Sequence, residues 1–167
     1  GITTAIGGPD GSAPWPLAPY LDGLERLGVG LNVCLLVGHN SVRRAVMALD
    51  DRAPTAKELA RMQAMVGQAM NEGAWGISTG LKYLPGSFAK TDEVIALSRE
   101  AAARGGFYTS HLREEGLGLI DSVKEAIEIG RQAKLPIVLT HHKVVGQPMW
   151  GRSRETLALV DAARREG

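Results

Sequence analysis

The chain has 167 residues, an ordinary hydrophobic fraction of 44% and a formal net charge of +1. These values are typical of one soluble globular unit, and the balanced charge gives no reason to expect a nucleic acid as partner. The single cysteine, Cys34, excludes an internal disulfide and favours a reducing compartment, so we expect a cytoplasmic protein. No apolar run reaches the roughly 20 residues that a membrane span needs, so we expect no membrane partner.

Strand-like and helix-like segments alternate along the chain. In chain order, we expect a strand at 1–6, a helix at 17–27, a strand at 29–37, helices at 42–49 and 56–71, a strand at 74–79, a helix from 91 to about 105, a strand at 107–110, a helix at 119–129, a strand at 136–140 and a helix at 153–165. The apolar run at 29–37 predicts a strand covered on both faces.

Two of the expected helices begin with capping residues. Thr55 is followed three residues later by Glu58, which is the capping-box pattern. Ser153, with Glu155 close behind it, predicts a second capped start. We therefore expect these two side chains to fix where their helices begin.

Alternating strands and helices predict βαβ units and a parallel sheet, that is, an α/β fold. Five units are too few for a closed eight-stranded barrel of about 250 residues, but they fit about five-eighths of one. A complete doubly wound sheet fits the count as well. The glycine-rich loop at 7–11 resembles a dinucleotide-binding fingerprint only loosely, because Pro9 removes a backbone donor. We therefore predict a partial TIM-type (β/α)8 barrel.

Histidines follow two successive strands at their carboxyl ends. His111 closes the strand at 107–110, and the strand at 136–140 stops at His141 and His142. Strand ends in such folds converge on one face, where Asp10, after the first strand, would join them. Adjacent side chains alternate along a strand, so only one histidine of the pair faces inward, and the register alone does not decide which.

One carboxylate and two neutral imidazoles are ligand types that hold a zinc-like divalent ion with a position open for water. Such an ion lowers the pKa of its water and polarises a carbonyl, which is a route to amide hydrolysis. The alternative for any one histidine is a helix cap or a core hydrogen bond, and for His39 alone we favour that structural role.

Two further side chains are candidates for substrate binding. Lys143 shares the side of His141, so an inward His141 would place an ammonium group beside the metal, suited to a substrate carboxylate. Tyr83 lies in a glycine- and proline-containing loop from which its phenol could reach a ligand. The alternatives are an exposed loop charge and a surface tyrosine. The charged run at 113–115 is typical of a solvated salt-bridge cluster.

Several short motifs occur in a fixed order over nearly the whole chain: Gly1-Ile2-Thr3-Thr4 with Gly8-Pro9-Asp10-Gly11, Gly38-His39-Asn40 with Val42-Arg43, Gly80-Leu81-Lys82-Tyr83-Leu84-Pro85-Gly86, Ser110-His111-Leu112-Arg113 and Thr140-His141-His142-Lys143. Together they resemble the D-aminoacylase group of the amidohydrolase superfamily. The resemblance implies a metal-dependent (β/α)8 barrel, usually with zinc, that hydrolyses the amide bond of small N-acyl-D-amino acids.

The resemblance also implies roles for individual residues. The family's metal-binding histidines on the fifth and sixth strands match His111 and His141, which selects His141 over His142. Its second-strand ligand, commonly cysteine or glutamate, matches Asp10, so this chain departs from the commoner residue. The tyrosine and lysine that grip the substrate carboxylate match Tyr83 and Lys143. We expect one or two divalent ions, with zinc as the metal.

Other parts of the family pattern would lie outside this chain. The His-x-His pair of the first strand falls before Gly1, and the catalytic acid/base aspartate of the eighth strand falls beyond Gly167. We therefore expect residues 1–167 to form one partial catalytic barrel domain, about strands two to six with their helices. The remaining strands and a small β domain would lie outside it, and this fragment alone would be inactive.

Two other functions compete with this one. A dihydroorotase- or hydantoinase-like cyclic amidase often bridges two metals with a carboxylated lysine at the fourth strand. Lys82 is the only lysine near that strand end, and it lies past Gly80 and Leu81 in the loop. The second alternative is a non-catalytic binding fragment whose histidines no longer hold a metal. The sequence assigns no chemical role to His39, Arg113 or His142.

Overall fold

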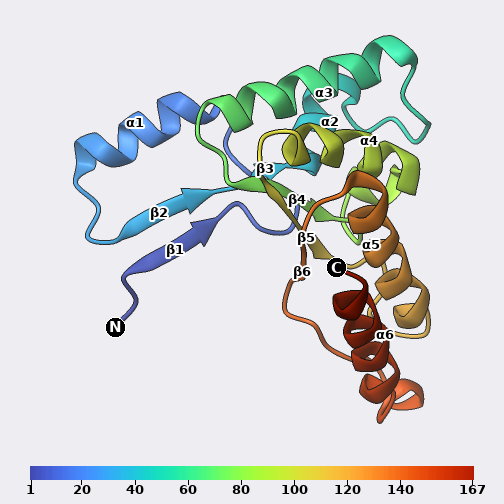
Figure 1. Ribbon diagram of the computed structural model, residues 1–167. Coiled ribbons are helices and arrows are strands. Elements are labelled where there is room, and N and C mark those ends of the chain that lie inside the picture. The colour runs from blue at the N-terminus through green and yellow to red at the C-terminus, as the bar shows by residue number, and fades with distance from the viewer.

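The computed structural model describes residues 1–167 as strands that alternate with helices (Figure 1). In chain order the elements are β1 (Thr4–Gly7), α1 (Leu17–Leu27), β2 (Asn32–Leu35), β3 (Val37–Gly38), α2 (His39–Met47), α3 (Ala56–Asn71), β4 (Gly76–Gly80), the 3-10 turn η1 (Gly86–Phe88), α4 (Thr91–Ala102), β5 (Phe107–His111), α5 (Leu119–Ala133), β6 (Ile137–Leu139), the 3-10 turn η2 (Gln147–Met149) and α6 (Ser153–Glu166). No helix is both long and apolar enough to cross a bilayer.

Every strand pair is parallel, as the alternation predicts. β1 pairs with β2, and a second sheet has the order β3-β4-β5-β6. Only Leu36 separates β2 from β3, so the two are successive parts of the strand expected at 29–37. The strands therefore follow one another in chain order without the reversal that marks a doubly wound sheet. Figure 1 shows α2 to α5 gathered along one side of the strands.

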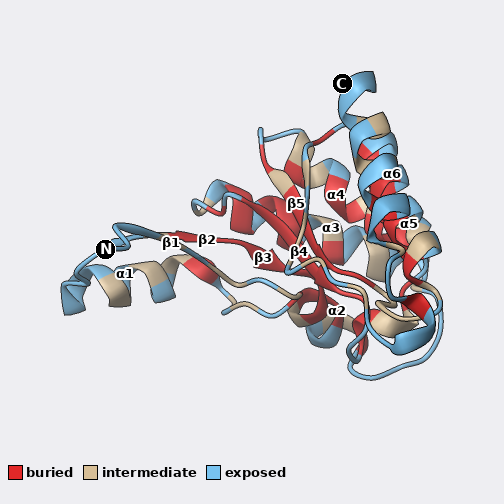
Figure 2. Ribbon diagram, turned by 90° about the horizontal axis from the view of Figure 1, so that it is seen from below, coloured by how far each residue is buried: buried red, intermediate tan, exposed pale blue.

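The hydrophobic core lies between these helices and the sheet. Val66 of α3, Leu97 of α4, Ile77 of β4 and Tyr108 of β5 are fully buried in one cluster of 21 residues. A smaller cluster of six buried residues joins α5, through Val123 and its neighbours, to Leu112 after β5 and to Met149 of η2. Each fully buried aliphatic side chain contributes about 1.5–3 kcal/mol to folding. Figure 2 shows this burial concentrated along β3, β4 and β5.

The β1–β2 pair and α1 form an arm that extends away from this core (Figures 1 and 2). Leu27 at the end of α1 is 80% exposed, and Val29 and Leu31 are exposed as well. Cys34, by contrast, is buried, as are the residues that follow it up to Val37. The prediction of a strand covered on both faces therefore holds for the second half of the 29–37 run and is wrong for its first half.

Helix α3 begins as its capping residues predict. The backbone N–H of Glu58 donates to Thr55 Oγ1 at 3.3 Å, and the Glu58 carboxylate accepts from the Thr55 N–H at 2.7 Å. The capped start predicted for α6 is wrong by one residue. Ser153 is the first helical residue there, and Arg152 precedes it without a side-chain cap. Arg152 instead donates to Glu155 at 2.7 Å, so an ion pair covers this helix start.

A buried polar cluster ties α2 to α4. His39 Nε2 lies 2.9 Å from Glu93 Oε1, and the Arg43 guanidinium pairs with the other oxygen of the same carboxylate. Arg43 also donates to the carbonyl oxygens of Asp50 and Arg52 at 3.2 and 2.8 Å. Burial by itself would raise the pKa of Glu93, but the hydrogen bonds from His39 and Arg43 outweigh it and lower that pKa. His39 thus has a structural partner, as expected for a lone histidine.

This cluster predicts a pH-dependent stability. Glu93→Gln removes the negative charge that compensates a buried guanidinium, so the free energy of unfolding at pH 7 should fall by about 3–5 kcal/mol. The folded-state pKa of Glu93 is lowered, so its contribution is present above the unfolded pKa of about 4.3 and lost as pH falls below it. Urea denaturation from pH 7 to pH 3 should show the difference from wild type shrinking in acid.

Glu155→Gln is the control, because Glu155 makes an exposed ion pair with Arg152 at the surface of α6. It should leave the urea midpoint close to that of wild type at both pH values. Equal losses in the two variants, or a Glu93→Gln loss that does not change with pH, would contradict this account of the cluster.

Candidate metal centre

The loop between β1 and α1 folds over the carboxyl ends of two other strands. The side chain of Ser78 on β4 donates to the Gly8 carbonyl at 2.6 Å and accepts from the Gly11 N–H at 3.1 Å. The Ser41 backbone N–H on α2 donates to the Gly11 carbonyl at 3.2 Å. These bonds fix the loop that carries Asp10 above β4, the neighbour of β5.

Glycines permit this close contact between backbones. A Cβ added to Gly80 at the end of β4 would lie 2.2 Å from the Asp10 carbonyl oxygen. A Cβ added to Gly38 at the end of β3 would lie 2.4 Å from the Gly11 carbonyl oxygen. Asp10 itself has a φ of 57°, a left-handed conformation that asparagine and aspartate tolerate better than most residues. The loop thereby delivers the Asp10 side chain to the end of β5.

The two histidines come from strand ends, as predicted. His111 is the last residue of β5 and pairs in register with Gly80. It is buried and shares a strand face with Thr109, which pairs with Ser78 under the Asp10 loop. His141 lies in a turn two residues beyond β6 and has a φ of 39°. The turn, not the pleat of a strand, therefore directs His141 toward His111.

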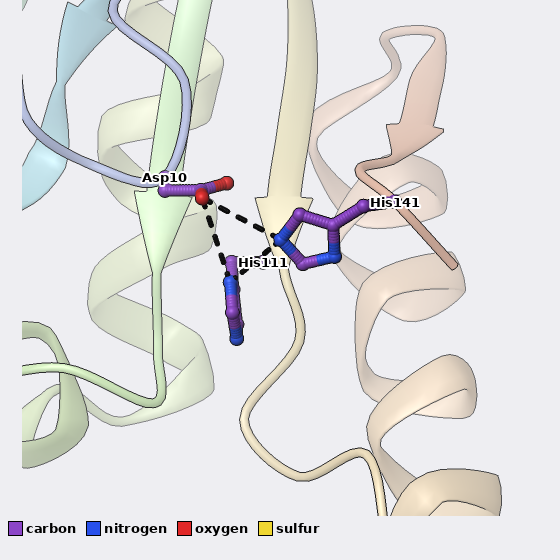
Figure 3. A group of neighbouring side chains, drawn as sticks. All are labelled: Asp10, His111 and His141. Carbon is purple, nitrogen blue, oxygen red and sulfur yellow. Dashed lines mark hydrogen bonds and ion pairs between the residues drawn. The ribbon is translucent and has the colours of Figure 1, made fainter. Parts of the chain in front are cut away.

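The three predicted ligands meet in space (Figure 3). Asp10 Oδ2 lies 3.5 Å from His111 Nδ1 and 3.5 Å from His141 Nε2. The two ring nitrogens are 2.8 Å apart, and the rings meet edge to face with centroids 4.4 Å apart. The structure thus gathers a carboxylate and two imidazoles from three separate strand–helix connections.

This arrangement fits a divalent ion. Tetrahedral ligands at about 2.0–2.1 Å from zinc lie about 3.3–3.5 Å from one another. The oxygen–nitrogen separations match this value, and the nitrogen pair at 2.8 Å would have to open by about 0.5 Å. Asp10 Oδ1 is buried without a hydrogen-bond partner, and a cation bound at Oδ2 would offset the charge of this partly unsatisfied carboxylate. Positive φ at two of the three residues is strain of the kind that collects at functional sites.

Tyr83 stands at the edge of the cluster. Its hydroxyl lies 3.3 Å from His111 Nδ1, and its ring meets the imidazole edge to face at 4.6 Å. Asn40 holds this loop, because its side-chain amide donates to the carbonyls of Gly80 and Tyr83 at 3.1 and 3.3 Å. Sequence reasoning missed this role of Asn40, although its position two residues after the end of β3 was a signal.

Lys143 lies on the other side of the cluster. Its Nζ is 2.9 Å from His141 Nδ1 and 2.5 Å from Glu115 Oε1. The prediction that Lys143 shares the side of His141 is confirmed in space, even though strand β6 has already ended. An ammonium group has three N–H donors, so these two contacts leave one for another acceptor.

His142 takes a different direction from its neighbour. His142 Nε2 lies 2.9 Å from Thr156 Oγ1 on α6, and burial lowers the pKa of the imidazole. The Thr156 hydroxyl in turn donates a hydrogen bond to the Ser153 carbonyl at 3.0 Å. His142 therefore joins the end of β6 to α6 and does not reach the cluster.

The charged run at 113–115 does not form one solvated cluster. Arg113 makes a forked ion pair with Glu125 on α5, at 2.9 and 2.8 Å, and donates to the Ser87 and Ala89 carbonyls beside η1. Glu114 pairs with Lys82 at 2.9 Å, and this bond with those from the backbone N–H groups of 116 and 115 lowers the pKa of Glu114 to about 2. The Lys82 ammonium is thus engaged by Glu114.

Several known proteins are similar to this chain in sequence and in fold. No family model matches the chain. A D-aminoacylase from Alcaligenes xylosoxydans xylosoxydans is 45% identical over 146 residues, which are 87% of this chain and 30% of that protein. The structure of an N-acyl-D-glutamate deacylase from Bordetella bronchiseptica, complexed with zinc and a phosphonate mimic of the tetrahedral intermediate, superposes with a TM-score of 0.93 at 39% identity. It matches 100% of this chain and 40% of the solved one.

The chain is similar to D-aminoacylase-type amidohydrolases in sequence and fold. A D-aminoacylase structure described for the role of its binuclear metal centre also superposes with a TM-score of 0.91, at 36% identity over 99% of this chain and 40% of that one. The resemblance drawn from the motifs is confirmed, as is the prediction of a partial amidohydrolase barrel. The chain spans about 30% of the length of the curated D-aminoacylase that it matches.

Because Gly80 lies against the Asp10 loop, we expect one methyl group added at position 80 to lower the stability of the protein strongly. Gly80→Ala should lower the free energy of unfolding by about 1–3 kcal/mol, because its Cβ would collide with backbone atoms that must move. Gly30→Ala is the control, since a Cβ there meets nothing within 4 Å, and it should change stability by no more than about 0.5 kcal/mol. Urea denaturation measures both, and equal effects would argue against the close packing of this loop.

Proposed function

We propose that Asp10, His111 and His141 bind a divalent metal ion, with zinc as the metal and one or two ions in the complete site. We further propose that the intact protein hydrolyses the amide bond of N-acyl-D-amino acids. The observation that carries both proposals is the convergence of these three side chains within a chain that is similar to D-aminoacylases. The zinc in the similar N-acyl-D-glutamate deacylase structure supports the choice of metal.

The active enzyme would be larger than these residues. Residues 1–167 would form part of a catalytic barrel domain, about strands two to six with their helices, because they match 40% of the solved deacylase chain. The remaining strands, a small β domain and the acid/base aspartate would lie outside this chain, beyond Gly167 in the case of the aspartate. Residues 1–167 alone would then have no group to move the proton, and we expect them to be inactive.

The substrate carboxylate would bind between Tyr83 and Lys143. The Tyr83 hydroxyl flanks His111 and the Lys143 ammonium flanks His141, so the two donors stand on either side of the metal ligands. A carboxylate held by them would place the neighbouring amide over the cluster. A bound divalent ion supplies Lewis-acid polarisation of a carbonyl and makes water more acidic. The remaining donor of Lys143 would meet the carboxylate as a charge-assisted hydrogen bond.

Metal content tests the ligand set. His111→Ala, His141→Ala and Asp10→Ala should each bind zinc at least about tenfold more weakly than wild type, because each removes a direct ligand. His142→Ala is the matched control, since His142 bonds to Thr156 and should leave zinc binding unchanged. Equilibrium dialysis with elemental analysis measures the zinc per chain. Unchanged zinc content in both histidine variants would instead support a binding fragment without a metal site here.

Kinetics of the intact protein test the substrate assignment. Lys143→Met should raise KM for an N-acetyl-D-amino acid by about 10- to 100-fold, the cost of one charge-assisted hydrogen bond of about 1.5–3 kcal/mol. Lys82→Met is the control, because Lys82 pairs with Glu114 and should leave KM unchanged. A substrate with its carboxylate amidated should be hydrolysed poorly by wild type. Faster hydrolysis of a cyclic amide such as a hydantoin would point to the cyclic amidase alternative.

A further inference from the structure

Glu115 contacts three of the residues that the proposed site uses. Its Oε2 lies 3.6 Å from His111 Nε2, and its Oε1 lies 3.3 Å from His141 Nδ1. The same Oε1 lies 2.5 Å from Lys143 Nζ. Only 12% of the Glu115 side chain is exposed. One largely buried carboxylate therefore touches both imidazoles through the ring nitrogens that do not face Asp10.

We propose that Glu115 is a positioning residue that selects the metal-binding tautomer of both histidines and holds Lys143 beside them. This inference rests on the proposed metal site of Asp10, His111 and His141. It gives a definite role to a residue that the sequence suggested was part of a solvated charge cluster.

Glu115 can select a tautomer because a neutral imidazole carries its one proton on either of its two ring nitrogens. Each ring has one N–H and one lone pair, and a metal ion takes the lone pair. The negative charge of Glu115 favours the N–H on His111 Nε2 and on His141 Nδ1, the nitrogens that it faces. The lone pairs then lie on His111 Nδ1 and His141 Nε2, which both face Asp10 Oδ2. At 3.3 and 3.6 Å the effect is one of charge more than of strong hydrogen bonds.

The negative charge of Glu115 is needed because Lys143 acts on His141 in the opposite direction. An ammonium group only donates, so Lys143 at 2.9 Å from His141 Nδ1 favours the opposite tautomer, with the lone pair on that nitrogen. Glu115 offers the ammonium a stronger acceptor at 2.5 Å and faces the same His141 nitrogen. Glu115 thus lets Lys143 stay beside the site while His141 keeps its Nε2 lone pair toward Asp10.

The backbone around Glu115 is fixed from both sides. Its carbonyl accepts from the Val145 N–H at 2.8 Å, which joins the loop after β5 to the loop after β6. Its own N–H donates to the Glu114 carboxylate at 2.9 Å, and the Glu114 N–H donates to Ser122 on α5 at 3.0 Å. A carboxylate set on a braced loop can hold two imidazoles in place, as carboxylate partners of metal-binding histidines do.

Zinc affinity and imidazole tautomers test this role. Glu115→Gln keeps the size of the side chain but removes its charge, and it should weaken zinc binding about 10- to 100-fold in competition with a chromophoric chelator at pH 7. Nitrogen-15 NMR of the metal-free protein, where no ion fixes the tautomers, should also show that His111 and His141 lose their single protonation pattern in Glu115→Gln. Glu115→Asp keeps the charge and should recover part of the affinity.

Glu128→Gln is the control, because Glu128 is exposed on α5 and bonds to Gln132, apart from the loop that carries Glu115. It should leave zinc affinity and both tautomers unchanged, and circular dichroism should show all variants folded. Equal weakening in Glu128→Gln and Glu115→Gln, or wild-type affinity in Glu115→Gln, would overturn the role of Glu115. If His111→Ala and His141→Ala still lose zinc in that case, the metal site stands; if they do not, the proposed function itself fails.

Discussion

The close packing of the Asp10 loop on the ends of β3 and β4 is the constraint on which the candidate site depends. Parallel strands bring their carboxyl ends to one edge, but β1 and β5 are not neighbours, so strand order alone does not bring Asp10 to His111. Gly38 and Gly80 remove the side chains that would hold the loop away, and Ser78 supplies the hydrogen bonds that hold it down. The candidate site therefore depends on direct contact between the backbone of the Asp10 loop and the backbone at the ends of β3 and β4.

Around this contact, the polar groups that stabilise the fold lie at other places than the proposed metal ligands. The buried cluster of His39, Arg43 and Glu93 joins α2 to α4, and the forked pair of Arg113 with Glu125 joins the loop after β5 to α5. Asp10, His111 and His141 converge at the strand ends, where Asp10 Oδ1 is left without a partner. Glu115 stands between the two groups, since its loop is braced like a structural element and its carboxylate faces the site. This division is what a metal site needs, because ligands must be held by residues that do not themselves bind the ion.

Much of this could be predicted from the sequence where the signal is local. Strand–helix alternation, the Thr55 capping box and histidines at successive strand ends depend on residues near one another in the chain. The choice of His141 over His142 came from the family resemblance, because His141 lies in a turn to which strand alternation does not apply. The roles of Ser78 and Glu115 could not be predicted, since they arise only when loops from different units meet. The exposure of Val29 depends in the same way on what packs beside it.

The most direct test of the central claim is a crystal structure of the zinc-loaded protein with anomalous diffraction at the zinc edge. We expect one anomalous peak about 2.0–2.2 Å from a carboxylate oxygen of Asp10, from His111 Nδ1 and from His141 Nε2. A peak bound by His111 Nε2, or a peak at His39 or His142 with none between the three residues, would contradict it.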